Sequence, residues 1–526
     1  MRYPLRRNPW KIFETLPFLK KILQVRPTDS IYLAILNLLG DICWEIPYVI
    51  NDLSEIIEQL ITGEKENLRK SAFKTLIKAG RRSFLAVKKF AINFLSKDET
   101  IRDPLILEFL TSLHIPHEYV DVAEQTYFAI RETYLSSKSR DEDVSTGLLA
   151  LARLVSREEL VDLQGKFLSD LLNVFTSTSS EDVLKACVSA AIIPAWNKEI
   201  DLEPLYSEFL STLQNPMVST ELKLLILEAI QKILFLRTEF IENSFRTFLD
   251  ILDVTEDSNL KEKILSLLVS MFYFIKTSDI VDPLTHKMLD LLADPLETYS
   301  VKNKAGDLLE HIAKTDPSKI LLISRRILDS FKRISEWSVR DYLIRVAGET
   351  FKKLDTFEKD LAETLIEGLF DDATYMLSLE YLNTVSYKFP EEVSTLLDKI
   401  EKFSEMIKKV EEIVLKEESL ESYYHFVEEP KRIYIRILTN LGLNTQSVEI
   451  AKRIIDILSK LLATETDEII RRDVSISLKE LSLIDDTFLN YLREKANKYG
   501  IVEILKKYNI NICLLYTSDA ADDGES

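Results

Sequence analysis

Two short amphipathic helical patterns recur as a pair along this chain at intervals of about 40 residues. Several of the first patterns open with an aliphatic residue followed by Lys or Arg. The openings at Leu222-Lys223, Leu260-Lys261, Val301-Lys302 and Val339-Arg340 follow one another at steps of 38, 41 and 38 residues. A single pair of this kind cannot bury its apolar face, so neighbouring pairs must stack on one another. The repeat therefore predicts an extended array of helical pairs.

The composition favours helices throughout. Glycine occurs only 11 times in 526 residues, which leaves few positions for the positive-φ turns of β-rich folds. Helix-start signals such as SSEDV, EDSNL and DPSK separate the amphipathic segments. We therefore predict an all-α fold.

The segments ENLRKSAFKTLIKAG (66–80) and EIIRRDVSISLKELS (468–482) resemble HEAT repeats, and the resemblance extends over roughly residues 29–510. In the second segment the expected buried stripe is Ile470, Val474, Ser477/Leu478 and Leu481. The resemblance implies a right-handed superhelical α-solenoid of about twelve HEAT-like helical hairpins. HEAT motifs specify a fold and not an activity.

Five regions are expected. Residues 1–28 would form an N-terminal helical cap, 29–389 HEAT-like repeats, 390–428 an extended or extra helix, 429–512 further repeats, and 513–526 a disordered tail that is not native.

The region 390–428 interrupts the repeat, because successive first helices begin near 374 and near 429. Its apolar residues follow a heptad pattern over three repeats. One interpretation is a protruding helix that pairs with a partner or a second copy, and the other is an additional helix packed within the array. The candidate pairing seam consists of Val393, Leu396, Ile400, Phe403, Ile407, Val410 and Val414.

Charge is unevenly distributed. The formal net charge is −19, yet residues 1–100 carry an excess of Lys and Arg. The segment 67–97 contains no acidic residue and nine basic ones: Arg69, Lys70, Lys74, Lys78, Arg81, Arg82, Lys88, Lys89 and Lys97. This basic segment could bind an acidic protein tail, an anionic membrane surface or nucleic acid. It could equally be a solvated face balanced by acidic neighbours.

The sequence contains no combination of residues typical of a catalytic or metal site. Nucleotide-binding glycine motifs and the HExxH and GxSxG motifs are absent, and a proline separates the one close histidine pair, His114 and His117. Cys43 and Cys187 lie in apolar surroundings typical of buried, unreactive thiols. We expect no enzymatic activity, no cofactor, no metal and no small-molecule substrate.

The C-terminal residues CLLYTSDAADD (513–523) do not continue the helical pattern. They resemble a translated sequencing-library adapter, the transposase mosaic end with its flanking primer. The resemblance implies that Cys513 is not native, and that the authentic chain continues past Ile512 with a different sequence.

The expected function is that of a non-catalytic scaffold or adaptor that binds other proteins along a solenoid surface. The alternative is binding of nucleic acid or an anionic membrane through residues 69–97. The N-terminus lacks the apolar run of a secretory signal, and the apolar stretch 264–275 is about half the ~20 residues of a membrane span. A cytoplasmic location is therefore expected.

Overall fold

The computed structural model describes residues 11–25, 28–136, 139–156, 160–192, 197, 199–274, 278–415 and 423–510. Within these ranges all regular secondary structure is helical and no strand occurs. The chain forms two compact units, Met1–Lys263 and Ile264–Ser526, and the boundary falls inside helix α16. The predicted tail 513–526 lies outside the described residues.

Unit 1 begins with α2 (Ile12–Gln24), which precedes the first helical pair. The first helices of its pairs are α3 (Asp29–Cys43), α6 (Glu66–Arg82), α8 (Pro104–Ser112), α10 (Asp141–Val155), α12 (Glu181–Ala191) and α14 (Thr220–Leu236). The second helices are α4 (Val49–Asp52) with α5 (Ser54–Thr62), α7 (Phe84–Leu95), α9 (Val120–Tyr134), α11 (Val161–Ser177), α13 (Glu203–Gln214) and α15 (Ile241–Val254).

Unit 2 repeats the arrangement. Its first helices are α16 (Ser258–Met271), α18 (Tyr299–Thr315), α21 (Trp337–Lys353), α23 (Tyr375–Lys388), α27 (Glu429–Asn444) and α29 (Glu468–Ser482). Its second helices are α17 (Ser278–Ala293), α19 (Pro317–Leu321) with α20 (Ser324–Arg333), α22 (Lys359–Gly368), α24 (Pro390–Ser394) with α25 (Leu397–Val414), α28 (Val448–Thr464) and α30 (Asp486–Tyr499). A short helix, α31 (Val502–Lys507), follows the last pair.

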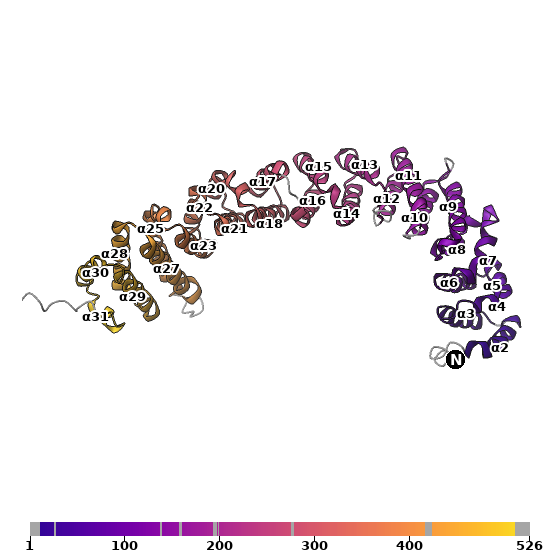
Figure 1. Cartoon of the computed structure of the whole chain (residues 1–526), viewed down its shortest axis with the longest axis horizontal. Helices are drawn as coiled ribbons and strands as arrows, with labels where there is room; N and C mark the ends of the chain where they lie inside the picture. The colour runs from indigo at the N-terminus through magenta and orange to yellow at the C-terminus, as the bar shows by residue number, and fades with distance from the viewer. Residues whose placement is uncertain are drawn as a thin grey trace, which may run out of the picture. The chain divides into compact units, whose positions relative to one another are not determined.

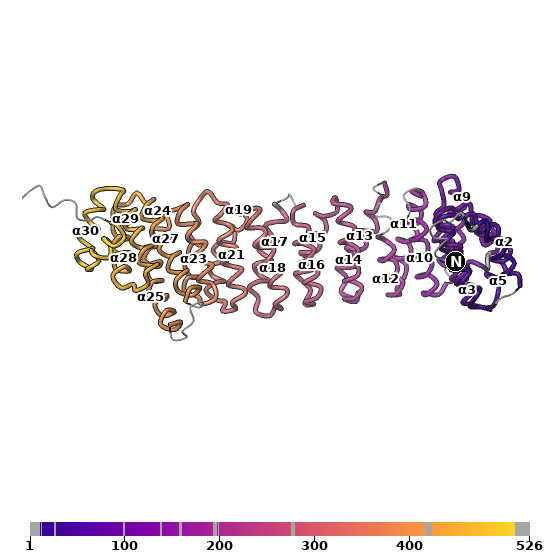
Figure 2. Tube along the Cα trace, turned by 90° about the horizontal axis from the view of Figure 1, so that it is seen from below, coloured from indigo at the N-terminus to yellow at the C-terminus, as the bar shows by residue number. Residues whose placement is uncertain are grey.

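The helices of each unit lie in two rows (Figure 1). In unit 2, α18 packs on α21, α21 on α23, α23 on α27 and α27 on α29, and Figure 2 shows these first helices side by side. The described residues thus contain twelve helical pairs, which confirms the predicted α-solenoid of about twelve hairpins.

Helix α29 illustrates how the local sequence produces a first helix. The carboxylate of Asp467 accepts hydrogen bonds from the backbone N–H groups of Ile469 and Ile470 at 2.8 and 3.1 Å, and so caps the helix start. The predicted apolar stripe is buried: the side chains of Ile470, Val474 and Leu478 are fully enclosed. The cap therefore explains where this helix begins, and the 3.6-residue period explains which of its faces is buried.

Two glycines allow neighbouring first helices to approach closely. A Cβ atom at Gly348 of α21 would lie 2.1 Å from the ring of Tyr381 in α23, and one at Gly306 of α18 would lie 2.5 Å from the ring of Tyr342 in α21. Because a methyl group cannot fit at these distances, glycine at these positions is what allows each tyrosine ring to lie flat against the preceding helix.

Candidate protein-interaction surface

The basic residue that opens many first helices connects consecutive pairs. In α21 the Nε atom of Arg340 donates to the carbonyl oxygen of Ile334 at 2.5 Å, and the guanidinium forms an ion pair with Asp371, which precedes α23. Lys302 of α18 lies 2.5 Å from Glu336, which precedes α21. These ion pairs, which we call the inter-pair ladder, link the first helices that carry them to the loop that starts the next first helix.

The inter-pair ladder recurs elsewhere in both units. In unit 1, Arg69 donates to the carbonyl oxygen of Ile61 at 2.8 Å and pairs with Asp103. In unit 2, Lys431 lies 2.9 Å from Glu465. The sequence revealed the aliphatic-basic opening only as a marker of the repeat. Its partners lie 31 to 34 residues further along the chain, so their role required the structure.

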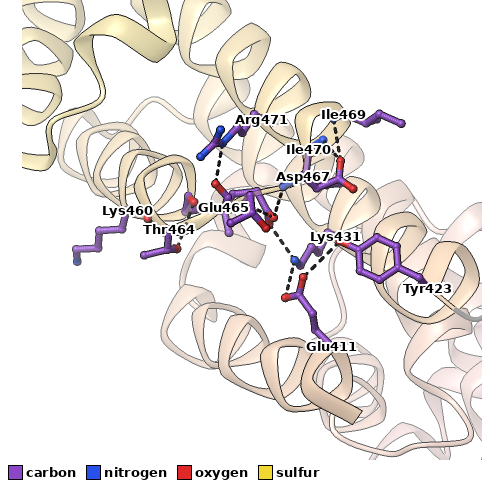
Figure 3. A network of polar contacts seen from close by, with 12 residues as sticks. Glu411, Tyr423, Lys431, Lys460, Thr464, Glu465, Asp467, Ile469, Ile470 and Arg471 are labelled. Atoms are coloured by element: carbon purple, nitrogen blue, oxygen red, sulfur yellow. Dashed lines mark hydrogen bonds and ion pairs between the residues drawn. The ribbon is translucent and has the colours of Figure 1, made fainter. Parts of the chain in front are cut away.

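Lys431 is the centre of a buried polar network (Figure 3). Its ammonium lies 2.8 Å from Glu411 at the end of α25 as well as 2.9 Å from Glu465, and Tyr423 donates to Glu411 at 3.3 Å. Glu465 also accepts the backbone N–H groups of Thr466 and Asp467. Burial, reinforced by the nearby carboxylates, raises the pKa of Tyr423 well above its usual range.

This network joins three segments that are distant in sequence: the end of α25, the start of α27 and the loop before α29. Each of its three charged groups has at least one partner of opposite charge within the network. Its role is therefore structural.

The candidate pairing seam in α24 and α25 does not form a free surface. Val393, Ile400 and Phe403 are fully buried, Leu396, Ile407 and Val414 are nearly so, and Val410 is half-buried. The Phe403 ring packs 5.5 Å from the ring of Tyr434 in α27. These residues cover neighbouring helices of unit 2, so the structure replaces the protruding-helix interpretation of the seam with a packed one.

The nine residues of the basic segment lie on α6, on α7 and just after α7. Four of them form ion pairs with acidic residues: Arg69–Asp103, Lys70–Glu66, Lys78–Asp41 and Lys89–Glu58. The ammonium of Lys88 lies 4.2 Å from the centre of the Tyr119 ring. Lys74, Arg81, Arg82 and Lys97 are exposed, and the first three form no ion pair with any described residue. The surface is thus less basic than the sequence alone indicates.

One edge of unit 2 exposes large apolar side chains. Tyr299 and Trp337 are the first residues of α18 and α21, and each lies three positions before a basic residue of the inter-pair ladder. Leu296, in the loop before α18, is 91% exposed, and Trp337 is 63% exposed. Phe370, in the turn before α23, is also exposed. We call Leu296, Tyr299, Trp337 and Phe370 the apolar edge.

The inter-pair ladder holds the apolar edge together. Glu336, the ladder partner of Lys302, directly precedes Trp337, and Asp371, the partner of Arg340, directly follows Phe370. Consecutive loops that carry exposed apolar groups are therefore fixed side by side by partly buried ion pairs. Sequence reasoning missed this edge, although the equal register of Tyr299 and Trp337 was a usable signal.

Charged side chains on neighbouring second helices of unit 2 form ion pairs with one another. Ion pairs join each described second helix of this unit to the next: Arg326–Asp290, Arg325–Asp360, Lys399–Glu363, Arg453–Asp398 and Lys495–Asp456. This face therefore offers fewer uncommitted groups to a partner than the apolar edge does.

The described residues contain no cluster of three or more His, Cys, Asp or Glu side chains that could hold a metal ion. Burial raises the pKa of both the Cys43 and the Cys187 thiol to about 12, which keeps them protonated and unreactive. Among the described residues, no helix combines the length and the apolar character needed to span a bilayer.

No protein-family model matches the chain, and no curated protein matches it. Among known structures, a chain in a homology model of the full-length AP-3 complex is 14% identical, with a TM-score of 0.53, over 92% of this chain and 90% of that chain. Kap95p in a structure with RanGDP is 12% identical, with a TM-score of 0.46, over 93% of this chain and 70% of that chain. Yeast importin-beta (Kap95p) is 12% identical, with a TM-score of 0.40, over 92% of this chain and 77% of that chain.

At such low identities the similarity concerns the fold alone. Together with the stacked helical pairs, the similarity to the AP-3 chain identifies the fold as a HEAT-type α-solenoid.

Proposed function

We propose that this chain is a non-catalytic scaffold or adaptor in the cytoplasm, and that the apolar edge of unit 2 is a surface on which it binds another protein. The observation that carries the proposal is the exposure of four large apolar side chains, Leu296, Tyr299, Trp337 and Phe370, on or directly after consecutive loops of unit 2. Apolar groups gathered on one surface are typical of protein–protein contact sites.

The chemistry of the apolar edge suits a binding hot spot. Trp and Tyr are enriched among the residues that dominate binding free energies, because their large rings lose much water-exposed area on association. The inter-pair ladder holds the loops in place before a partner arrives, which reduces the entropy that binding must overcome. The AP-3 similarity supports the fold needed for such a scaffold and does not bear on the partner.

The test compares two variants. Tyr299→Ala with Trp337→Ala removes the centre of the apolar edge, and Tyr387→Ala removes an equally exposed ring at the end of α23 as a matched control. Partners recovered with the tagged chain from source cells are identified by quantitative mass spectrometry, and the strongest is purified for titration.

The double variant is expected to weaken binding of that partner by at least about tenfold. Tyr387→Ala should leave the affinity unchanged, and both variants should keep the wild-type melting temperature. Equal affinity of wild type and the double variant would show that the apolar edge is not the binding surface.

A further inference from the structure

A pocket opens between two successive helical pairs of unit 1. It has a volume of about 610 Å³ and lies between the ends of α13 and α15 and the starts of α14 and α16. Its lining includes Leu213, Ile251 and Leu260, which are buried, and Val254, which is 77% exposed. All of its lining residues belong to unit 1. The pocket therefore has an apolar floor and an open rim.

Lys223 also lines this pocket, and it is the basic residue that opens α14. It occupies the register of Lys302 and Arg340, which carry the inter-pair ladder in unit 2. Ladder partners lie 31 to 34 residues after the basic residue, and Asp257 falls in this window. Yet Lys223 forms no ion pair with Asp257 or with any other described residue. The ladder is thus open at this position.

The carboxylate of Asp257 is committed to other donors. Its Oδ1 atom accepts the backbone N–H groups of Asn259 and Leu260 at 2.9 and 3.1 Å, and so caps the start of α16. Its Oδ2 atom accepts the hydroxyl of Thr220 at 2.9 Å. Thr220 stands at the register of the two aromatic rings of the apolar edge. A hydroxyl at this register therefore holds the carboxylate that would otherwise pair with Lys223.

The ammonium of Lys223 consequently lacks a counter-charge in a half-buried position. Burial lowers the pKa of Lys223, and the charge of Asp257 offsets only part of this effect. A charge that has lost water without gaining a close partner is stabilised by any ligand that supplies the opposite charge. The missing group here is a carboxylate.

Two further charges stand at the rim of the pocket. Asp250 and Glu256 line it, both are exposed to water, and neither forms an ion pair with a described residue. A ligand complementary to the whole pocket therefore carries an acidic group for Lys223, a basic group for the rim and an apolar group for the floor. Adjacent residues of one peptide segment supply all three.

We propose that this pocket, which we call the Lys223 pocket, binds a short segment of a partner protein in which a large apolar residue is flanked by one acidic and one basic residue. The apolar side chain covers the floor, and the carboxylate pairs with Lys223 in place of Asp257. Proteins built from stacked repeats commonly bind their partners along extended surfaces. The Lys223 pocket lies in unit 1, so the proposal is independent of the apolar edge.

The test uses pentapeptides with blocked ends as probes. Gly-Lys-Phe-Asp-Gly and Gly-Asp-Phe-Lys-Gly present the two charges in both orders, and a copy of each with asparagine in place of the aspartate removes the carboxylate. Binding to the full chain is measured by titration with saturation-transfer NMR, which suits the dissociation constants of about 1 mM expected for ligands of this size.

Three variants are compared with wild type. Lys223→Gln removes the ammonium, and Lys232→Gln, at an exposed position of the same helix, is the matched control. Val254→Asp places a charge on the apolar lining at an exposed position. Because none of these side chains is fully buried, all three variants should keep the wild-type melting temperature.

Wild type and Lys232→Gln are expected to bind one acidic probe at least about threefold more tightly than its asparagine copy. Lys223→Gln should bind the two copies equally, and Val254→Asp should weaken both at least about threefold. An acidic probe that keeps its advantage in Lys223→Gln would overturn the proposal, as would equal binding by wild type and Val254→Asp or no binding of either order. Binding of N-acetylphenylalanine as tight as that of the better probe would also overturn it, because the pocket would then suit a small carboxylate.

Discussion

The ammonium of Lys431 lies 2.9 Å from a carboxylate oxygen of Glu465, and only 4% of the lysine and 3% of the glutamate side chain are exposed. Glu411, 2.8 Å away on the other side, completes a buried group of one positive and two negative charges. Such a group is stable only while its charges are paired, since a lone charge in the interior has lost its water without compensation.

Lys431→Met is therefore expected to destabilise the fold by about 3–5 kcal/mol, because it leaves two carboxylates without a counter-charge. The measurement is thermal unfolding followed by circular dichroism. Lys408→Met, at an exposed position of α25, is the control and should melt like wild type. A combined Lys431→Met, Glu411→Gln and Glu465→Gln variant removes all three charges and keeps oxygens that can accept from Tyr423 and from the backbone of Thr466 and Asp467. It should recover most of the loss; if it does not, unpaired charge is not the cause.

Two glycine substitutions should act in opposite directions. Gly348→Ala places a methyl group 2.1 Å from the Tyr381 ring, and we expect a loss of about 1–3 kcal/mol from overpacking. Gly165→Ala, in α11, meets no atom within 4 Å and should stabilise the helix by about 0.4–1 kcal/mol. Urea unfolding curves measure both, and a Gly348→Ala variant as stable as wild type would show that α21 and α23 can separate at little cost.

His311 makes stability depend on pH. Its Nε2 atom is buried and has no hydrogen-bond partner among the described residues, and the ring lies edge-on to Phe272 and Tyr273. Burial, with a smaller effect of Lys314, lowers the pKa of His311 in the folded chain. The unfolded chain then binds the proton more readily, so this contribution to stability is complete above the unfolded pKa of about 6.5 and is lost as the pH falls below it.

Replacing the imidazole should reduce that loss. The urea midpoint of His311→Phe is expected to fall less than that of wild type between about pH 7.5 and about pH 5.5. His114→Asn, which removes an exposed imidazole, serves as the control and should follow the wild-type curve. Identical pH dependence of His311→Phe and wild type would show that His311 is not a source of the loss of stability at low pH.

The basic segment should not act as a strong anion-binding site. Because Arg69, Lys70, Lys78 and Lys89 already have acidic partners, few of its charges are available to phosphate groups. We expect cosedimentation with phosphatidylserine vesicles at near-physiological salt to differ less than about twofold between wild type and a Lys74→Glu, Arg81→Glu, Arg82→Glu variant. Strong, salt-sensitive binding that this variant abolishes would restore the alternative function.

The fold was predictable to the extent that its signals are local. The buried residues Ile470, Val474 and Leu478 of α29 could be predicted from their spacing alone, because side chains three and four residues apart share a helix face. The heptad spacing of the seam in α24 and α25 could also be seen in the sequence, but it did not tell whether the seam packs within the array or pairs with a partner. A helix that packs in the array and one that pairs with a partner have the same pattern, and only the position of Tyr434 beside Phe403 separates them.

The candidate surface was less predictable. The sequence shows nine basic residues between 69 and 97, but not that Asp103 and Asp41 reach two of them from other helices. It shows Trp337 at a helix start, but not that the pairing of Lys302 with Glu336 sets that residue on an exposed edge.

Stacked helical pairs follow from local features of the chain, since apolar periodicity, caps such as Asp467 and the scarcity of glycine all act within a few residues. Which charges remain free and which apolar groups remain exposed is set only in the folded array. Those properties depend on partners about 34 residues away, as with Arg69 and Asp103, and a distance of that kind is set only when successive pairs pack.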